Sequence, residues 1–143
     1  MKFQNPVVVG SGSWGTALAV FLANKCPQVH LIGRDEQVTA AINSTHCNER
    51  YLPNSTLPQN LIATTDLSLV TKADLLLFVV PTKATRSTAE NLVSLNIPES
   101  AVILSCAKGI ELETGKRMSQ IIGDYFPSNQ IAVLSGPNHA EEI

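Results

Sequence analysis

Three glycines near the N-terminus, Gly10, Gly12 and Gly15, have the spacing G-x-G-x-x-G and could bind a diphosphate. In this spacing the first glycine allows a tight turn, the second lets the backbone approach a pyrophosphate, and the third lets a helix pack closely on a strand. The diphosphate would lie at the N-terminus of that helix, where free N–H groups and the helix dipole stabilise it. The alternative is a glycine-rich turn without a ligand.

The segments around the glycines have the pattern that this chemistry needs. Residues 6–9 are apolar and predict a strand, and residues 14–24, rich in Ala and Leu, predict a helix that is apolar nearly all round and therefore buried. Pro27 ends this helix, and residues 29–32 predict a second strand. Strand, glycine turn and helix in this order predict a dinucleotide-binding unit.

The residues after the second strand bear on the choice between NAD and NADP. A carboxylate there accepts hydrogen bonds from the ribose 2′-OH of NAD, whereas an arginine can pair with the 2′-phosphate of NADP. The chain has Arg34 followed by Asp35. Arg34 favours NADP, but Asp35 leaves NAD open, and it is equally interpretable as the N-cap of a helix.

Two further segments follow predicted strands and could contact a ligand. Lys108 and Gly109 come after the strand predicted at 101–106, where an ammonium suits a phosphate or a carbonyl oxygen. Gly136 and Asn138 come after the strand predicted at 131–134, and their N–H and amide groups could bind an anion. Taken alone, Lys108 could equally be an exposed lysine at a strand end.

The remaining pattern alternates short apolar runs with longer helical segments, which is typical of βαβ units. We expect further strands at 62–65 and 74–80, and helices at 38–43, 84–95 and 114–126. Residues 48–60 carry two prolines and predict a loop, and Asp66 and Asp74 are expected as caps. The fold class is therefore α/β: a Rossmann-type, doubly wound, mostly parallel sheet, expected to be incomplete at its C-terminal end.

Length, composition and charge narrow the class of protein. The 143 residues fit one domain, and 44% apolar and 15% charged residues exclude intrinsic disorder and a disulfide scaffold. The net charge is −2, so no basic field is present for nucleic acid. Apolar runs such as 75–80 are far shorter than the ~20 residues of a membrane span. We expect a cytoplasmic protein.

The three cysteines are scattered, with no C-x-x-C pair and no histidine at ligand spacing. This pattern indicates reduced thiols and no metal site.

Five collinear segments together resemble one family. The chain is similar to the N-terminal half of bacterial NAD(P)-dependent glycerol-3-phosphate dehydrogenase through Gly10-Ser11-Gly12-Ser13-Trp14-Gly15-Thr16-Ala17, Asn48-Glu49-Arg50-Tyr51-Leu52-Pro53, Val79-Val80-Pro81, Ala107-Lys108-Gly109-Ile110-Glu111 and Leu134-Ser135-Gly136-Pro137-Asn138-His139-Ala140-Glu141-Glu142. The resemblance implies reversible reduction of dihydroxyacetone phosphate to sn-glycerol 3-phosphate, a step that feeds phospholipid synthesis.

The resemblance also implies roles for individual residues. It places NAD or NADP on the glycine turn and on Ser13, Trp14, Arg34 and Ala140, makes Lys108 a contact for both cofactor and substrate, and places substrate on Gly136 and Asn138. Asn138 stands where bacterial members commonly carry Ser or Thr. Thr85 stands where many carry a bulky apolar residue near the nicotinamide.

The family's proton-transferring lysine belongs to a following segment, and most of its substrate residues lie there and in an all-helical C-terminal domain. Neither part is in residues 1–143, and the chain ends where Pro137, Asn138 and Glu141 predict the start of a helix. We therefore expect a fragment that binds cofactor but is inactive alone. The parent protein could assemble as a homodimer.

Two alternatives remain open. One is a hydroxy-acid dehydrogenase of similar two-domain build. The other is a dinucleotide-binding redox sensor without catalysis.

Overall fold

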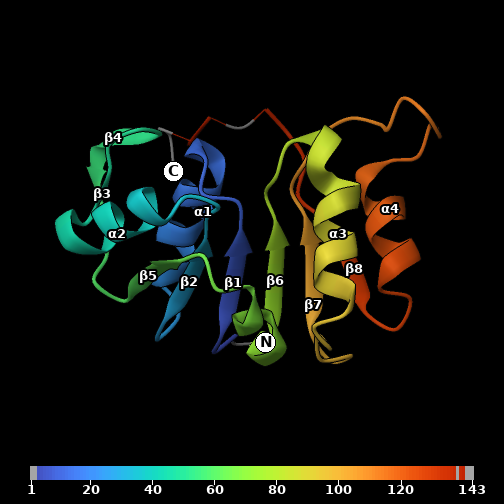
Figure 1. The fold of residues 1–143 in the computed structure, drawn as a ribbon, viewed down its shortest axis with the longest axis horizontal. Helices are drawn as coiled ribbons and strands as arrows, with labels where there is room; N and C mark the ends of the chain where they lie inside the picture. Colours follow the sequence, from blue (N-terminus) through green and yellow to red (C-terminus); the bar gives the residue numbers. More distant parts are fainter. Residues whose placement is uncertain (1–2, 138, 141–143) are drawn as a thin grey trace.

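The computed structural model describes residues 3–137 and 139–140, which form a main sheet flanked by helices and a separate two-stranded sheet (Figure 1). In chain order the elements are β1 (Pro6–Val9), α1 (Ser13–Ala23), β2 (Val29–Ile32), α2 (Glu36–Thr45), β3 (Cys47–Asn48), β4 (Leu52–Thr56), β5 (Leu61–Thr64), the 3₁₀ helix η1 (Leu67–Lys72), β6 (Leu75–Phe78), the 3₁₀ helix η2 (Thr82–Ala84), α3 (Thr85–Val93), β7 (Val102–Ser105), α4 (Met118–Tyr125) and β8 (Gln130–Val133).

The main sheet has six strands in the order β5-β2-β1-β6-β7-β8, and all its pairings are parallel. The chain runs from β1 to one side of the sheet and then crosses over to the other, so β1 and β6 flank the point where the winding reverses. Both strands are buried along their whole length. Ligands bind doubly wound sheets outside the carboxyl ends of the strands at this point.

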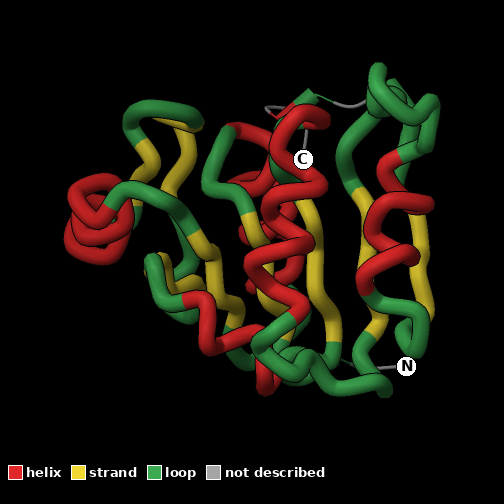
Figure 2. Tube along the Cα trace, turned by 45° about the vertical axis from the view of Figure 1, so that its right-hand side comes forward, coloured by secondary structure: helices red, strands yellow, loops and turns green. Residues whose placement is uncertain are grey.

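Alternate residues of the central strands pack into cores on the two faces. Val8 belongs to a cluster with residues of α1 and α2, whereas Val7 and Val9 belong to a cluster with residues of α3 and α4. This division follows from the two-residue period of a strand. Figure 2 shows the strands of the main sheet between the helices, with the β3–β4 pair set apart. The predicted Rossmann-type fold is confirmed, while the expected incompleteness at the C-terminal end stays a prediction.

The expected loop at 48–60 is partly wrong, because β3 and β4 form a short antiparallel pair there. The turn closes through a hydrogen bond from the Tyr51 N–H to the Asn48 carbonyl, at 3.1 Å. Leu52 and Leu57 anchor the segment, since they are only 5% and 2% exposed. Proline content predicted a loop, but buried side chains and the hydrogen bond from the Leu57 N–H to the His46 carbonyl hold the segment as a hairpin.

The helix expected at 114–126 begins later, at Met118. Residues before it form a turn instead, with a bridge between Ile110 and Arg117 and Gly115 at φ +70°. A positive φ is incompatible with a right-handed helix.

The expectation that the first helix is buried all round is also wrong at its edge, because Phe21 is 46% exposed and lies under the Lys25 ammonium.

Two acidic caps and three reduced cysteines were also predicted from the sequence. Asp66 caps η1 through the Ser68 N–H, as expected. Asp74, just before β6, accepts hydrogen bonds from the N–H groups of Gln4 and Asn5, so it caps the segment that enters β1. Cys106 is buried in the α1 side of the core, and burial raises the pKa of its thiol to about 12, which fits a packing role.

Among the described residues, no helix is long and apolar enough to cross a membrane.

Candidate functional site

The predicted ligand-contacting residues lie at one edge of the main sheet. Gly10 follows β1, Arg34 follows β2, Lys108 follows β7 and Gly136 follows β8. All these strands are parallel, so their carboxyl ends meet at the same edge. Asn138 and its predicted capping partner Glu141 lie outside the described residues.

The glycine turn is packed too closely for side chains at its first and third glycines. A Cβ on Gly10 would lie 2.1 Å from the Val79 carbonyl oxygen, and one on Gly15 would lie 1.8 Å from the Gly10 carbonyl oxygen. Gly10 also has φ +117°. A Cβ on Gly12 would meet no atom within 4 Å. The turn therefore keeps an open space at the second glycine, as a diphosphate site requires.

Helix α1 presents its N-terminus to this space. Gly12 is the N-cap and offers no side-chain cap, and the first turn contains no acidic residue. The N–H groups at the start of a helix have no partner within the helix. Those of Ser13 and Trp14 are therefore available to an anion, which the positive end of the helix dipole would also attract. The residues present fit a dinucleotide diphosphate.

Asp35 is occupied by contacts within the protein. Its Oδ1 accepts hydrogen bonds from the N–H groups of Gln37 and Val38, at 2.9 and 3.2 Å, and so caps α2. Its Oδ2 lies 4.0 Å from the Arg50 guanidinium. The N-cap interpretation of Asp35 is confirmed. Arg34 is exposed and makes no ion pair with another described residue.

Lys108 is exposed on the loop after β7, and a contact from η2 holds this loop in place. The Thr82 hydroxyl donates a hydrogen bond of 2.7 Å to the Lys108 carbonyl oxygen. The next residue, Gly109, has φ +105°. The backbone of Lys108 is therefore fixed near the end of β6 while its side chain is exposed to solvent.

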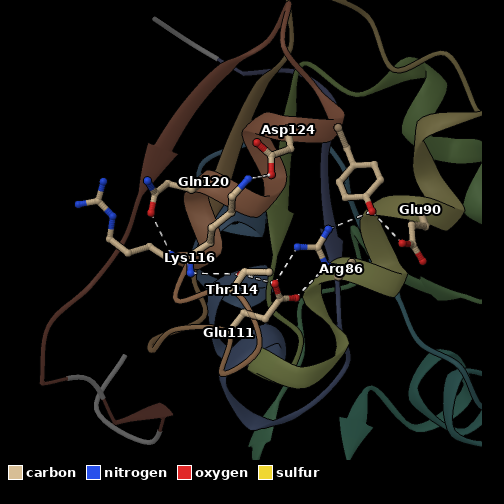
Figure 3. Close-up of polar contacts among 9 residues, drawn as sticks. Arg86, Glu90, Glu111, Thr114, Lys116, Gln120 and Asp124 are labelled. Carbon is tan, nitrogen blue, oxygen red and sulfur yellow. Dashed lines mark hydrogen bonds and ion pairs between the residues drawn. The ribbon is translucent and has the colours of Figure 1, made fainter.

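An ion pair fixes the same loop a few residues further on (Figure 3). Arg86 of α3 donates two hydrogen bonds to the Glu111 carboxylate, at 2.8 and 2.7 Å, in the two-pronged geometry that makes such pairs strong. The Thr114 hydroxyl also donates a hydrogen bond to the Glu111 carboxylate. Arg86 donates a further hydrogen bond to the hydroxyl oxygen of Tyr125 in α4. These hydrogen bonds lower the pKa of Glu111 to about 2 and raise the pKa of Arg86.

Thr85 and the segment around Gly136 complete the set of predicted residues. Thr85 is fully buried, and its hydroxyl oxygen has no hydrogen-bond partner among the described residues. The start of the Gly136 segment is held by a hydrogen bond from the Leu134 N–H to the Ser105 carbonyl, at 2.9 Å. Gly136 and Ala140 are half-buried.

The described residues hold no group of three or more His, Cys, Asp or Glu able to bind a metal ion.

Reasoning from single residues missed Asn48, which is buried beneath the glycine turn. Its side-chain amide donates to the Ser11 carbonyl and to the Thr16 hydroxyl. Its presence in one of the five resembling segments was the available signal. Its contact with residues more than 30 positions away could not be foreseen from local patterns.

A six-stranded parallel sheet in this order, with a glycine turn feeding a helix at the winding reversal, defines a Rossmann-type dinucleotide-binding domain. The chain belongs to the family of NAD-dependent glycerol-3-phosphate dehydrogenase N-terminal domains, whose model matches residues 6–143. The predicted resemblance is confirmed.

Individual relatives and solved structures agree with this family. The glycerol-3-phosphate dehydrogenases [NAD(P)+] of Enterococcus faecalis and Moorella thermoacetica are 43% and 45% identical, each over 98% of this chain and 42% of the relative. The glycerol-3-phosphate dehydrogenase structures from Saccharomyces cerevisiae and Coxiella burnetii have TM-scores of 0.87 and 0.86 at 30% and 29% identity, covering 99% of this chain and 44% and 43% of theirs. The chain thus spans about 42% of the length of the curated relatives it matches.

The open space at Gly12 generates a first prediction. Gly12→Val should fold normally, because Gly12 has φ −73° and its Cβ direction is unobstructed. The valine side chain would occupy the place of the diphosphate, so NADPH binding measured by calorimetry should be lost. Thermal unfolding is the control for folding. Unchanged NADPH affinity in a folded variant would contradict the assignment of this turn.

The Arg86–Glu111 pair generates a second prediction, for stability against pH. The folded-state pKa of Glu111 is about 2 against an ordinary 4.5, so its stabilising effect is present above pH 4.5 and is lost as the pH falls toward 2. In Glu111→Gln, urea unfolding at a series of pH values should show a smaller loss of stability over this window than in the wild type. Glu113→Gln, at an exposed neighbour, should keep the wild-type slope. An identical slope in all three proteins would show that the pair does not couple to folding.

Proposed function

We propose that the protein to which this chain belongs catalyses the reversible reduction of dihydroxyacetone phosphate to sn-glycerol 3-phosphate with NADPH or NADH. The family match across residues 6–143 carries the proposal. The glycine turn and the free N-terminus of α1 support it, because they fit the dinucleotide that such an enzyme requires. The product would supply phospholipid synthesis.

In this proposal the chain holds the cofactor along the carboxyl edge of the sheet. The N–H groups of Gly12, Ser13 and Trp14 bind the diphosphate, Arg34 binds the adenosine ribose end, and Lys108 and Ala140 contact the remainder. When bound, the reduced nicotinamide supplies a hydride for a carbonyl carbon. The close packing of Gly10 against Val79 keeps the turn in one conformation, so little ordering is needed on binding.

Lys108 is proposed as the principal substrate contact on this chain, together with Gly136 and Asn138. Its ammonium would stabilise the negative charge on substrate oxygens, and it can do so because its backbone is held by Thr82 and its loop by the Arg86–Glu111 pair. The proton-transferring lysine implied by the resemblance is not among residues 1–143.

The contacts of Asp35 support a preference for NADP. An NAD site at this position needs a carboxylate to accept the ribose 2′-OH. Both Asp35 oxygens face groups of the protein, one capping α2 and the other facing Arg50. Arg34 makes no competing ion pair among the described residues and is thus available to a 2′-phosphate.

The parent protein is further proposed to act in the cytoplasm, on a small phosphorylated substrate and without nucleic acid. Its assembly as a homodimer stays a prediction. The two other functions considered above, a hydroxy-acid dehydrogenase and a redox sensor, have no specific observation in their favour.

Arg34 provides a third prediction. Arg34→Ala should weaken NADPH binding about ten-fold or more while changing NADH binding little, since a charge-assisted hydrogen bond contributes roughly 1.5–3 kcal/mol. Calorimetric titration with both cofactors measures the difference. Equal losses for the two would mean that Arg34 does not distinguish them.

The incomplete set of reacting groups provides a fourth prediction. Residues 1–143 alone should bind NADPH but give no measurable oxidation of it with dihydroxyacetone phosphate, because a missing acid or base lowers rates by about 10²–10⁴-fold and lost substrate orientation lowers them further. The full-length parent should be active, and Lys108→Ala in it should reduce turnover by about 10²-fold or more. Absorbance at 340 nm follows both reactions. Robust turnover by residues 1–143 would mean that the catalytic groups are misassigned.

A further inference from the structure

Asn48 connects the β3–β4 hairpin to the glycine turn through a chain of buried hydrogen bonds. Its Nδ2 donates to the Ser11 carbonyl oxygen at 3.1 Å and to the Thr16 hydroxyl at 2.8 Å. The Thr16 hydroxyl in turn donates to the Gly12 carbonyl oxygen at 2.8 Å. Asn48 and Thr16 are 1% and 0% exposed, so water does not compete for these donors.

These hydrogen bonds orient the peptide groups of the turn. The carbonyl of Ser11 shares a peptide plane with the Gly12 N–H, and the carbonyl of Gly12 shares one with the Ser13 N–H. In a trans peptide the carbonyl and the N–H point in opposite directions, and the described chain has no cis bonds. Asn48 holds the Ser11 carbonyl directly, whereas the Gly12 carbonyl is held by the Thr16 hydroxyl together with the Thr16 N–H of the first helical turn, at 2.9 Å. With both carbonyls held on this side, the N–H groups of Gly12 and Ser13 point to the other side of the turn.

The asparagine at this buried position carries a cost for folding. The Oδ1 of Asn48 is buried and has no hydrogen-bond partner among the described residues. A buried polar atom without a partner lowers stability. An apolar side chain would avoid that loss, whereas only a side chain with two N–H donors can hold Ser11 and Thr16 together.

We propose that Asn48 is a positioning residue for the dinucleotide: its amide fixes the peptide planes at Ser11 and Gly12 so that the N–H groups of Gly12 and Ser13 face the diphosphate. Thr16 relays this effect to the Gly12 carbonyl. The inference rests on the dinucleotide binding in the proposed function. It goes beyond that function because Asn48 acts through the turn and needs no contact with the ligand.

The test compares a ligand that has a diphosphate with one that lacks it. Asn48→Asp is nearly isosteric but replaces the donor with an acceptor, which repels the Ser11 carbonyl and draws the Thr16 hydroxyl away from Gly12. We expect the affinity of the 143-residue chain for NADPH to fall at least ten-fold by calorimetry. Affinity for adenosine 2′-monophosphate, measured by ligand-observed NMR, should be unchanged.

Two substitutions at Thr16 keep the test decisive if the aspartate variant does not fold. Thr16→Val preserves the shape but removes the relay, and should weaken NADPH binding selectively. Thr16→Ser keeps the hydroxyl and should therefore bind NADPH with the wild-type affinity. The matched control is Asn60→Asp, because the Asn60 amide also holds backbone carbonyls, those of Ala23, Cys26 and Pro27, but at the opposite end of α1. It should lower thermal stability without changing the ratio of the two affinities.

The outcomes separate this inference from the function on which it rests. If the wild-type chain does not bind NADPH, the proposed function fails. If it binds NADPH and Thr16→Val keeps the wild-type affinity, the positioning role of Asn48 is wrong. Equal losses for NADPH and adenosine 2′-monophosphate, accompanied by lower thermal stability, would show a purely structural role and would also overturn the inference.

Discussion

The close approach of the glycine turn to β6 is the constraint on which the rest of the site depends. Gly10 lies against the Val79 carbonyl and Gly15 against the Gly10 carbonyl, with no room for a Cβ at either position. This packing seats the N-terminus of α1 at the carboxyl edge of the sheet, beside the point where the winding reverses. Free N–H groups and a positive dipole end are thereby placed where doubly wound sheets bind ligands.

Polar contacts between distant segments determine which charged groups remain exposed at this edge. Thr82 holds the backbone of Lys108, and the Arg86–Glu111 pair holds the loop after it. On the other side, Asp35 caps α2 through one carboxylate oxygen, and its other oxygen lies 4.0 Å from the exposed Arg50 guanidinium. Lys108, after β7, and Arg34, after β2, remain exposed cations on either side of the α1 N-terminus along this edge. A phosphorylated dinucleotide and a phosphorylated substrate both suit this distribution of charge.

Local patterns predicted the parts of this structure that depend on neighbouring residues. The buried strands at β1, β6 and β7 appear in the sequence as apolar runs, and the glycine spacing identified the turn, because each depends on only a few consecutive positions. The hairpin at β3–β4 was missed, since Leu52 and Leu57 are anchored by burial beneath other segments. The late start of α4 was missed for a similar reason: Gly115 and the bridge between Ile110 and Arg117 close a turn that helical periodicity does not reveal.

The sequence by itself determined the fold class, the position of the glycine turn between strand and helix, and the family, because residue type and spacing along the chain are sufficient to specify them. Only the tertiary structure decided how the turn is held and which charges remain available. Asn48 reaches Ser11 and Thr16 from a hairpin more than 30 residues away, and Asp35 is engaged by both its own helix and Arg50. Hydrogen bonds and ion pairs act over a few ångströms in space, so separation along the chain does not reveal them.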